Sequence, residues 1–457
     1  MEKIEKYVLI ASFITSFSTL FLLNGSSLAT PSIGREFLMN NVTQNWVITI
    51  VSIAIAATTI PAGQICSKYG CKKIFAAGGV IFLIGLILCC TSLSSNMFIA
   101  SSAVMGIGYS LYLVAETAII ALAIDQADRG KSFGMVIVGS YLGCIAAPLI
   151  GGFLITNFGW RTLYYVVMPL VILCIFITIT KINTEWVTNE NEKMDMVGCL
   201  LYVLGIILFV YGFSDLLSFT GKISIAMGII VLVIFGIYEY KTDLPVFKIR
   251  LFENKTFASY NLTGFFEFFA IAVFDVAFNY YFQYVKGWDP QMTGMILIIS
   301  PLILALMSPI SGRLSDRYHP QKIATIGLFV MLVSIVSLIF LKVGTPVYFV
   351  AGAMALIAFG TSLFSVPNTN AVMSSVDDEH APYASATELT LKSCGQTLSY
   401  GLLTLTCSFV MGALPLSTEY AGLFVNSMNI IAMVCTFLCL IAIAFSIRGI
   451  RSQNAVD

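Results

Sequence analysis

Long apolar runs separated by short polar connections divide the sequence, and this pattern restricts the fold more than any other feature. A helix needs about 20 predominantly apolar residues to cross a bilayer. Only 11% of the residues are charged and 58% are hydrophobic, against about 25% charged residues in soluble proteins. Lipid rather than water must therefore surround most of the surface. The runs are 7–29, 44–65, 74–93, 98–122, 133–156, 163–181, 196–217, 223–240, 256–284, 291–311, 322–341, 346–366, 386–411 and 424–447. They predict an all-α, polytopic membrane protein with 14 transmembrane helices.

Lysine and arginine are distributed unevenly between the two sets of connections. Cytoplasmic loops carry an excess of these residues, so we place the N-terminus inside. The cytoplasmic set is then Lys3, Lys6, Lys68, Lys72, Lys73, Arg129, Lys131, Lys181, Lys193, Lys241, Lys248, Arg250, Lys255, Arg313, Arg317, Lys322, Arg448 and Arg451. The opposite side holds only Arg35, Arg161, Lys222, Lys286 and Lys342. This asymmetry predicts that both termini are cytoplasmic. The first apolar run is longer than a signal peptide, which favours a multi-pass protein of a prokaryotic plasma membrane.

Two similar polar turns lie between apolar runs at matching places in the two halves of the chain. The first spans 63–73 and the second spans 312–322, and both contain glycine and cationic residues. Such a repeat is common in secondary transporters. The residues expected to govern conformation at these turns are Gly63, Gly70 and Lys72 in the first copy and Asp316 and Arg317 in the second. We expect glycine to let the helices meet closely across each turn.

The connections also predict how the chain is organised. Two longer polar links, 183–194 and 241–255, isolate a pair of helices in the middle of the sequence. We therefore expect an N-terminal six-helix bundle over 1–182, an inserted pair with its flanking loops over 183–255, and a C-terminal six-helix bundle with a short tail over 256–457. Neither link is long enough for a folded soluble domain.

Several functional classes are disfavoured by composition. The net charge is zero, which gives no reason to expect a nucleic-acid partner. The 11 cysteines lie mostly inside apolar runs and lack metal-ligand spacing. The two histidines, His319 and His380, fall in expected loops, with no nucleophile–histidine–acid arrangement. We predict no enzyme activity, no metal and no cofactor.

The fifth apolar run contains the most specific motif. It reads Gly143-x-x-x-Ala147-Pro148-Leu149-Ile150-Gly151-Gly152 and is followed by Gly159-Trp160-Arg161. Along nearly its whole length the chain resembles the fourteen-helix drug:proton antiporter branch of the major facilitator superfamily, which includes quaternary-ammonium and multidrug exporters. The resemblance implies that Gly143, Pro148, Gly151 and Gly152 form a kinked helix that gates access. The alternative is ordinary packing of small residues in a membrane helix.

Three positions depart from the family pattern. The resemblance leads one to expect an acidic residue at Leu22, an arginine at Ser102 and an aspartate at Ser67. The first two of these groups are those that family members use for proton coupling and cation binding. Other side chains must replace them if this chain couples transport to protons.

Four carboxylates at membrane depth are candidates, since an ionisable group there costs about 2.5–3.5 kcal/mol and is functional by default. They are Glu116, Glu267, Asp275 and Glu388. Glu267 lies near the middle of its run between four phenylalanines. An apolar setting favours the neutral form of a carboxyl group, which suits proton uptake and release, whereas the structural alternative is a protonated acid bonded to a neighbouring helix. Glu388 lies four residues before Lys392, a spacing that favours a structural ion pair.

Asn24 and Tyr112 are candidates for hydrogen bonds to a substrate. The leading hypothesis is a monomeric secondary transporter that exports lipophilic cationic drugs in exchange for protons, by alternating access of two six-helix bundles. Its partners are a small-molecule substrate, protons and the lipid bilayer. The alternative is an uncoupled uniporter, or a carrier of a neutral or anionic metabolite, on the same fold.

Overall fold

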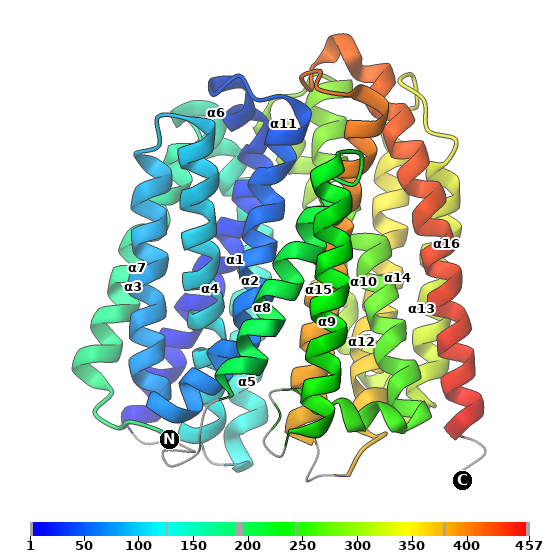
Figure 1. Ribbon diagram of the computed structural model, residues 1–457. Coiled ribbons are helices and arrows are strands. Elements are labelled where there is room, and N and C mark those ends of the chain that lie inside the picture. The colour runs from blue at the N-terminus through cyan, green and yellow to red at the C-terminus, as the bar shows by residue number, and fades with distance from the viewer. Residues whose placement is uncertain are drawn as a thin grey trace. The chain divides into compact units, whose positions relative to one another are not determined.

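The computed structural model describes residues 3–124, 126–187, 195–242, 245, 247–377 and 381–453, and all regular structure in this part of the chain is helical (Figure 1). The first half contains α1 (Lys3–Glu36), α2 (Asn41–Tyr69), α3 (Cys71–Cys90), α4 (Ser95–Ala123), α5 (Gln126–Ala146), η1 (Ala147–Gly151), α6 (Gly152–Phe158), α7 (Arg161–Lys181) and α8 (Met196–Ser214). The second half contains α9 (Phe219–Lys241), η2 (Ile249–Glu253), α10 (Lys255–Tyr280), η3 (Tyr281–Val285), α11 (Pro290–Leu297), α12 (Ile299–Arg317), α13 (Pro320–Leu338), α14 (Val347–Met373), α15 (Ala381–Met411), η5 (Thr418–Tyr420) and α16 (Ala421–Gln453).

The helical architecture follows from the apolar runs, because backbone groups in lipid must find their hydrogen-bond partners within the protein. Among the described residues, thirteen helical segments are long and apolar enough to span a bilayer. The fourteenth helix is α15, which is 31 residues long and carries Glu388 and Lys392. The prediction of an all-α fold with fourteen helices is confirmed.

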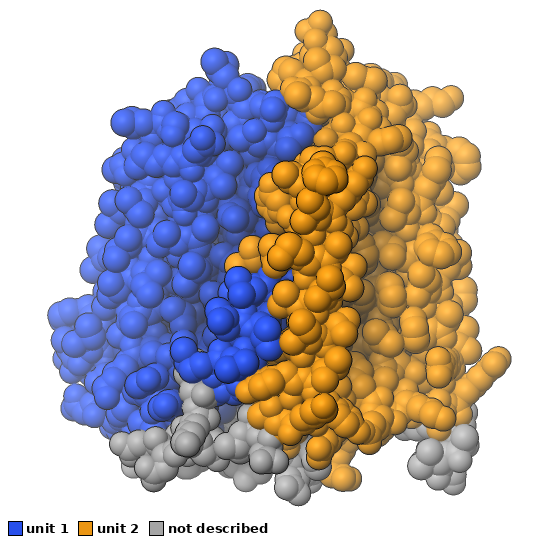
Figure 2. All heavy atoms as spheres, in the orientation of Figure 1, with its two compact units in different colours: residues 1–206, 289–295 blue, residues 207–288, 296–457 orange. Residues whose placement is uncertain are grey.

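The chain forms two compact units (Figure 2). Unit 1 comprises residues 1–206 and 289–295, and unit 2 comprises residues 207–288 and 296–457. The boundary between them falls inside α8, and residues 290–295 of α11 belong to unit 1. These two units do not test the predicted division into two six-helix bundles and an inserted helix pair. That division stays a prediction.

The turn between α2 and α3 is shorter than the sequence pattern indicated. Helix α2 continues through Gly63 as far as Tyr69, and an added Cβ at Gly63 would meet no atom within 4 Å. The turn is made by Gly70 alone, whose φ of +104° is a backbone conformation that favours glycine. Gly63 is therefore a helix residue, and in this conformation it is not needed for a close approach.

Helix α5 passes into a short π-helical segment at its proline motif. Pro148 lacks a backbone N–H and cannot continue the α-helical hydrogen-bond ladder. The segment Ala147–Gly151 adopts wider π-helical turns before α6 resumes at Gly152. The expected interruption of this helix is present.

Candidate functional site

Glu116 lies in the interior of unit 1 on α4 and is fully buried. Ser16 on α1 donates a hydrogen bond of 2.7 Å to its Oε1 atom. The other carboxyl oxygen, Oε2, has no hydrogen-bond partner among the described residues. The neighbouring hydroxyls of α1, Thr15 and Thr19, bond to carbonyls of their own helix. Ser16 is thus the hydroxyl of this helix that serves Glu116.

Tyr112 and Asn24 have different environments. Tyr112 lies one turn before Glu116 on α4, and its buried ring packs against Phe75 with ring centroids 4.5 Å apart. Asn24 on α1 is exposed, and its Nδ2 atom donates to the carbonyl oxygen of Leu20 at 2.9 Å and to the Cys144 sulfur at 3.6 Å. Tyr112 therefore belongs to the core beside Glu116, whereas Asn24 is accessible.

Glu267 lies in the interior of unit 2 on α10, with 1% of its surface exposed. Neither carboxyl oxygen has a hydrogen-bond partner in the described part of the chain. The phenylalanines on either side of it in the sequence, Phe266 and Phe268, are partly buried. A buried carboxylate without partners carries a large desolvation cost, so in this conformation the side chain must be neutral.

An ion pair lies close to Glu267. Lys392 and Glu388 on α15 pair at 2.6 Å, as their spacing predicted. Thr369 on α14 donates to the same Glu388 oxygen at 2.6 Å and accepts from the Lys392 ammonium at 3.1 Å. The ammonium also lies 5.7 Å from the centre of the Phe268 ring. Lys392 lies close enough to Glu267 to interact with it electrostatically. Its charge is already neutralised by the ion pair with Glu388.

Asn368 adds an unpaired amide to this group, although the sequence did not make it a candidate for proton or substrate binding. It is fully buried on α14, and neither side-chain atom has a partner among the described residues. A Cβ built on Gly264, one turn before Glu267, would lie 3.3 Å from the Asn368 Nδ2 atom and 3.6 Å from the Lys392 Cε atom. The side chains of α14 and α15 thus converge on the turn of α10 that carries Glu267.

Asp275 does not share the environment of Glu267. Its side chain is exposed, whereas its neighbours from Ala272 to Phe274 and from Val276 to Tyr284 are buried. Tyr400 on α15 lies close enough to interact electrostatically with Asp275 and accepts a hydrogen bond of 3.0 Å from Gln396. Asp275, Gln396 and Tyr400 form a polar group in which Asp275 is exposed and the other two are half-buried, in contrast to the buried carboxyl group of Glu267.

The motif of the fifth helix packs against other parts of unit 1. A Cβ on Gly143 would lie 2.4 Å from the Phe17 carbonyl oxygen on α1, so only glycine permits this contact. Pro148 and Gly151 are buried in the π-helical segment. A Cβ on Gly152 would lie 2.8 Å from the Pro290 carbonyl oxygen at the start of α11. Gly143 and Gly152 therefore permit close helix contacts within the unit, and the gating role predicted for the motif stays a prediction.

Glu185 is a functional candidate that sequence analysis missed. It lies in the connection after α7, and its Oε1 atom accepts hydrogen bonds from the backbone N–H groups of Lys72 at 2.9 Å and Lys73 at 3.4 Å. The carbonyl oxygen of Trp186 accepts from the N–H of Cys71 at 2.9 Å. A Cβ on Gly70 would clash with the Glu185 carboxylate. Glu185 thus caps the N-terminus of α3, which has no acidic residue of its own.

The second turn is described only in part. The side chain of Asp316 lies outside the described residues, and so does His380. Arg317 is exposed in the last turn of α12. The role predicted for Asp316 and Arg317 stays a prediction.

The neutral residues at the departing positions are packed into unit 1. Leu22 is fully buried, and Ser102 is 1% exposed and donates 2.8 Å to the Phe98 carbonyl oxygen of its own helix. Neither position offers the solvation that an unpaired charge would require. Glu116 is a fully buried carboxyl group in the same unit.

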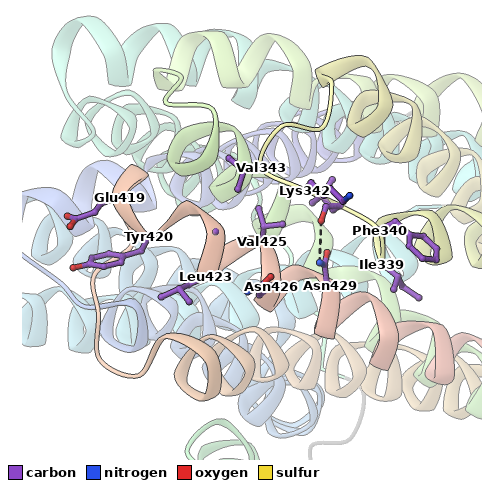
Figure 3. Close-up of a pocket in the computed structure, with 12 residues that line it drawn as sticks. Ile339, Phe340, Lys342, Val343, Glu419, Tyr420, Leu423, Val425, Asn426 and Asn429 are labelled. Carbon is purple, nitrogen blue, oxygen red and sulfur yellow. Dashed lines mark hydrogen bonds between the residues drawn. The ribbon is translucent and has the colours of Figure 1, made fainter.

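A surface hollow in unit 2 lies away from all these residues. Its volume is about 740 Å³, and it is lined by the connection after α13 and by the first turns of α16 (Figure 3). None of the predicted site residues lines it. The described residues also contain no group of three or more histidine, cysteine, aspartate or glutamate side chains that could hold a metal ion.

Comparison with known proteins identifies the family. The model described as Major Facilitator Superfamily matches residues 9–400. The chain belongs to this superfamily. It is accordingly a multi-pass membrane transporter and not an enzyme. A crystal structure of the peptide transporter POT in complex with sulfate has the same fold, with a TM-score of 0.73 at 14% identity, covering 99% of this chain and 96% of that one.

Two curated relatives from bacteria are similar over most of the chain. The riboflavin transporter RibZ of Clostridioides difficile (strain 630) is 26% identical over 440 residues, covering 94% of this chain and 95% of the relative. The multidrug resistance protein Stp of Mycobacterium tuberculosis (strain CDC 1551 / Oshkosh) is 24% identical over 409 residues, covering 88% and 76%. The superfamily is thus established, and these relatives transport or confer resistance to different compounds.

Proposed function

We propose that this major-facilitator transporter exports lipophilic cationic organic compounds in exchange for protons, by alternating access. The observation that carries the proposal is the state of Glu267, a buried carboxyl group with no hydrogen-bond partner for either oxygen among the described residues. Such a group is stable in the membrane only when protonated or when paired with a cation.

Proton and substrate would therefore compete for the same carboxyl group. In the conformation described, Lys392 is paired with Glu388, and among the described residues no ion pair to Glu267 is formed. A proton fulfils that role in the absence of substrate, and a cationic substrate fulfils it after the proton leaves. Exclusive occupancy by one or the other is the requirement for antiport, because binding of one ligand then drives release of the other.

Glu116 is proposed as the second proton carrier. It is buried in unit 1, and one of its oxygens is bonded to Ser16 while the other is unpaired within the described residues. It lies in the unit that lacks the family's acidic residue at Leu22 and its arginine at Ser102. Glu116 would thus supply the titratable group that those substitutions remove.

A second candidate function is the transport of a neutral or anionic metabolite, with riboflavin as the first compound to test. It is favoured by the similarity to RibZ over 94% of the chain. The neutral residues at positions 22 and 102 agree with it. Asn368 offers an unpaired donor and acceptor, the groups that bind the polar edge of an uncharged ring.

The test uses purified protein in liposomes with an imposed pH gradient. Ethidium and riboflavin are both fluorescent, so uptake of each is followed directly. The variants are Glu267→Gln and Glu116→Gln, because glutamine mimics the neutral carboxyl group and preserves its shape. Glu253→Gln, an exposed residue in η2, is the matched control.

We expect gradient-driven ethidium uptake in the parent protein and in Glu253→Gln, and its loss in Glu267→Gln. Riboflavin uptake that does not depend on the gradient, without ethidium uptake, would replace the proposal with the second candidate. Gradient-driven uptake at the parent rate in Glu267→Gln would remove this residue from the mechanism.

A further inference from the structure

Two carboxyl groups and one ammonium group lie together in the interior of unit 2. Glu267 belongs to α10, and Glu388 and Lys392 belong to α15. The side chains of Glu388 and Lys392 are only 5% and 13% exposed. The three groups are electrically neutral together when Glu267 is protonated. They carry one excess negative charge when Glu267 is ionised, because the two carboxylates then share a single ammonium.

The Lys392 side chain runs along the turn of α10 that carries Glu267. A Cβ built on Gly264, three residues before Glu267, would lie 3.6 Å from the Lys392 Cε atom and 4.0 Å from its Cγ atom. The ammonium nitrogen lies 5.7 Å from the centre of the Phe268 ring, one residue after Glu267. The ammonium and the Glu267 carboxyl group are close enough to interact electrostatically. Lys392 therefore flanks Glu267, although no ion pair between them forms among the described residues.

The ammonium group keeps one hydrogen-bond donor for Glu267. A lysine ammonium has three N–H donors. One of them serves Glu388 Oε1 at 2.6 Å, and another serves Thr369 Oγ1 at 3.1 Å. The Thr369 hydroxyl also donates to the same Glu388 oxygen at 2.6 Å, so Glu388 retains a partner when the ammonium moves. The four-carbon stem of lysine is flexible and lets the ammonium turn between neighbouring acceptors.

The other helices packed against this turn of α10 bring uncharged polar groups. Helix α14 brings the buried amide of Asn368 beside Gly264. Helix α16 brings the thiol of Cys439, which lies close enough to Glu267 to interact electrostatically and donates to the Leu328 carbonyl oxygen at 3.5 Å. Within the described residues, Lys392 is therefore the cation available to an ionised Glu267.

Building on the proposed function, we infer that Lys392 is an internal counter-ion that stabilises ionised Glu267 when neither proton nor substrate is bound. When the proton leaves to water, the Lys392 ammonium donates to Glu267 and shares its charge between the two carboxylates. A buried carboxylate without such a partner would be strongly disfavoured. A cationic substrate then displaces Lys392 from Glu267, and Lys392 returns to full pairing with Glu388. Lys392 acts through Glu267 and is a positioning residue.

The count of charges predicts opposite effects for two changes. Glu388→Gln leaves one ammonium for one carboxylate, so Lys392 alone neutralises ionised Glu267 and competes more strongly with a cationic substrate. Lys392→Met combined with Glu388→Leu removes both partners, so ionised Glu267 again needs a proton or a cation from outside the protein. A merely structural ion pair between Glu388 and Lys392 would instead affect stability and leave binding at Glu267 unchanged.

The first measurement is the affinity of the purified full-length protein for ethidium, by fluorescence titration. The proteins compared are the parent, Glu388→Gln, the double variant Lys392→Met with Glu388→Leu, and Glu267→Gln. Glu253→Gln, at an exposed position of η2, is the matched control for the loss of a glutamate charge. We expect ethidium affinity to fall about tenfold in Glu388→Gln, as for one charge-assisted hydrogen bond. The double variant should bind ethidium at least as tightly as the parent and the control.

The second measurement needs no substrate. Dicyclohexylcarbodiimide enters membranes and reacts with protonated carboxyl groups, and mass spectrometry of peptides then gives the rate at which Glu267 is labelled. We expect Glu388→Gln to slow this labelling several-fold at neutral pH, because ionised Glu267 is then paired with Lys392. The double variant should restore the rate to at least that of the parent. Labelling of Glu267 at the parent rate in Glu388→Gln would overturn the counter-ion role.

The two measurements separate the counter-ion role from the proposed function. The expected labelling pattern without any ethidium binding would reject ethidium as a substrate and keep Lys392 as the counter-ion of Glu267. Ethidium binding that is lost in Glu267→Gln, with unchanged labelling and affinity in Glu388→Gln, would keep the proposed function and reject the counter-ion role.

Discussion

Replacing Gly143 by alanine should destabilise unit 1 by an amount that the structure sets. The added Cβ would lie 2.4 Å from the Phe17 carbonyl oxygen and 3.1 Å from the Phe21 nitrogen, both backbone atoms of α1. No side-chain rotation can relieve this contact, so the two helices must separate by about 1 Å to reach an ordinary contact of 3.4 Å. Forced repacking of this kind costs roughly 1–3 kcal/mol.

Gly134→Ala on the same helix is the matched control, because a Cβ there would meet no atom within 4 Å. Both substitutions gain about 1 kcal/mol of intrinsic helix propensity, so their difference isolates the clash. Thermal unfolding of the two purified variants in the same detergent measures that difference. We expect a clearly lower midpoint for Gly143→Ala, and equal midpoints would refute the close contact between α1 and α5.

Three further predictions concern polar contacts and are measured by the same unfolding assay. Glu185→Ala should lower the free energy of unfolding by about 1 kcal/mol, because it removes the cap of α3. Glu185→Gln should lower it less, since glutamine keeps an acceptor. An unchanged stability of Glu185→Ala would contradict the capping role. Lys392→Met should lower the free energy of unfolding by about 3–5 kcal/mol, because it leaves Glu388 buried without its ion-pair partner. The double variant Lys392→Met with Glu388→Leu should recover most of the loss. A double variant as unstable as Lys392→Met would contradict a stabilising ion pair between the two residues. Arg161→Lys should lower the free energy of unfolding by about 1 kcal/mol, since lysine cannot reproduce the guanidinium contacts to Glu36 and to two carbonyl oxygens. A variant as stable as the parent would show that these contacts do not stabilise the fold.

The number and type of elements could be predicted from the sequence because the bilayer leaves few alternatives. Each apolar run long enough to span the membrane had to form a helix. Helix ends were less predictable, since residues 66–69, which include Ser67 and Lys68, extend α2 beyond its apolar run 44–65. The ion pair of Glu388 and Lys392 was predictable because both residues belong to one helix.

Contacts between distant parts of the chain could not be predicted in this way. Ser16 and Glu116 are 100 residues apart, and nothing in either local sequence indicates that they meet. Glu185 caps a helix 113 residues earlier through a connection that the sequence marks only as polar. Asp275 lies two turns after Glu267 on the same helix, yet its side chain is exposed and that of Glu267 is buried, a difference that the local sequence does not indicate; its role stays a prediction.

The central claim is that a proton and a cationic substrate exclude one another at Glu267. The most direct measurement is the number of protons that the purified transporter releases when ethidium is added in a weakly buffered solution, read with a pH indicator. The account predicts substrate-dependent proton release by the parent protein and by Glu253→Gln, and its loss in Glu267→Gln. Ethidium binding with no proton release, or undiminished release in Glu267→Gln, would contradict the account.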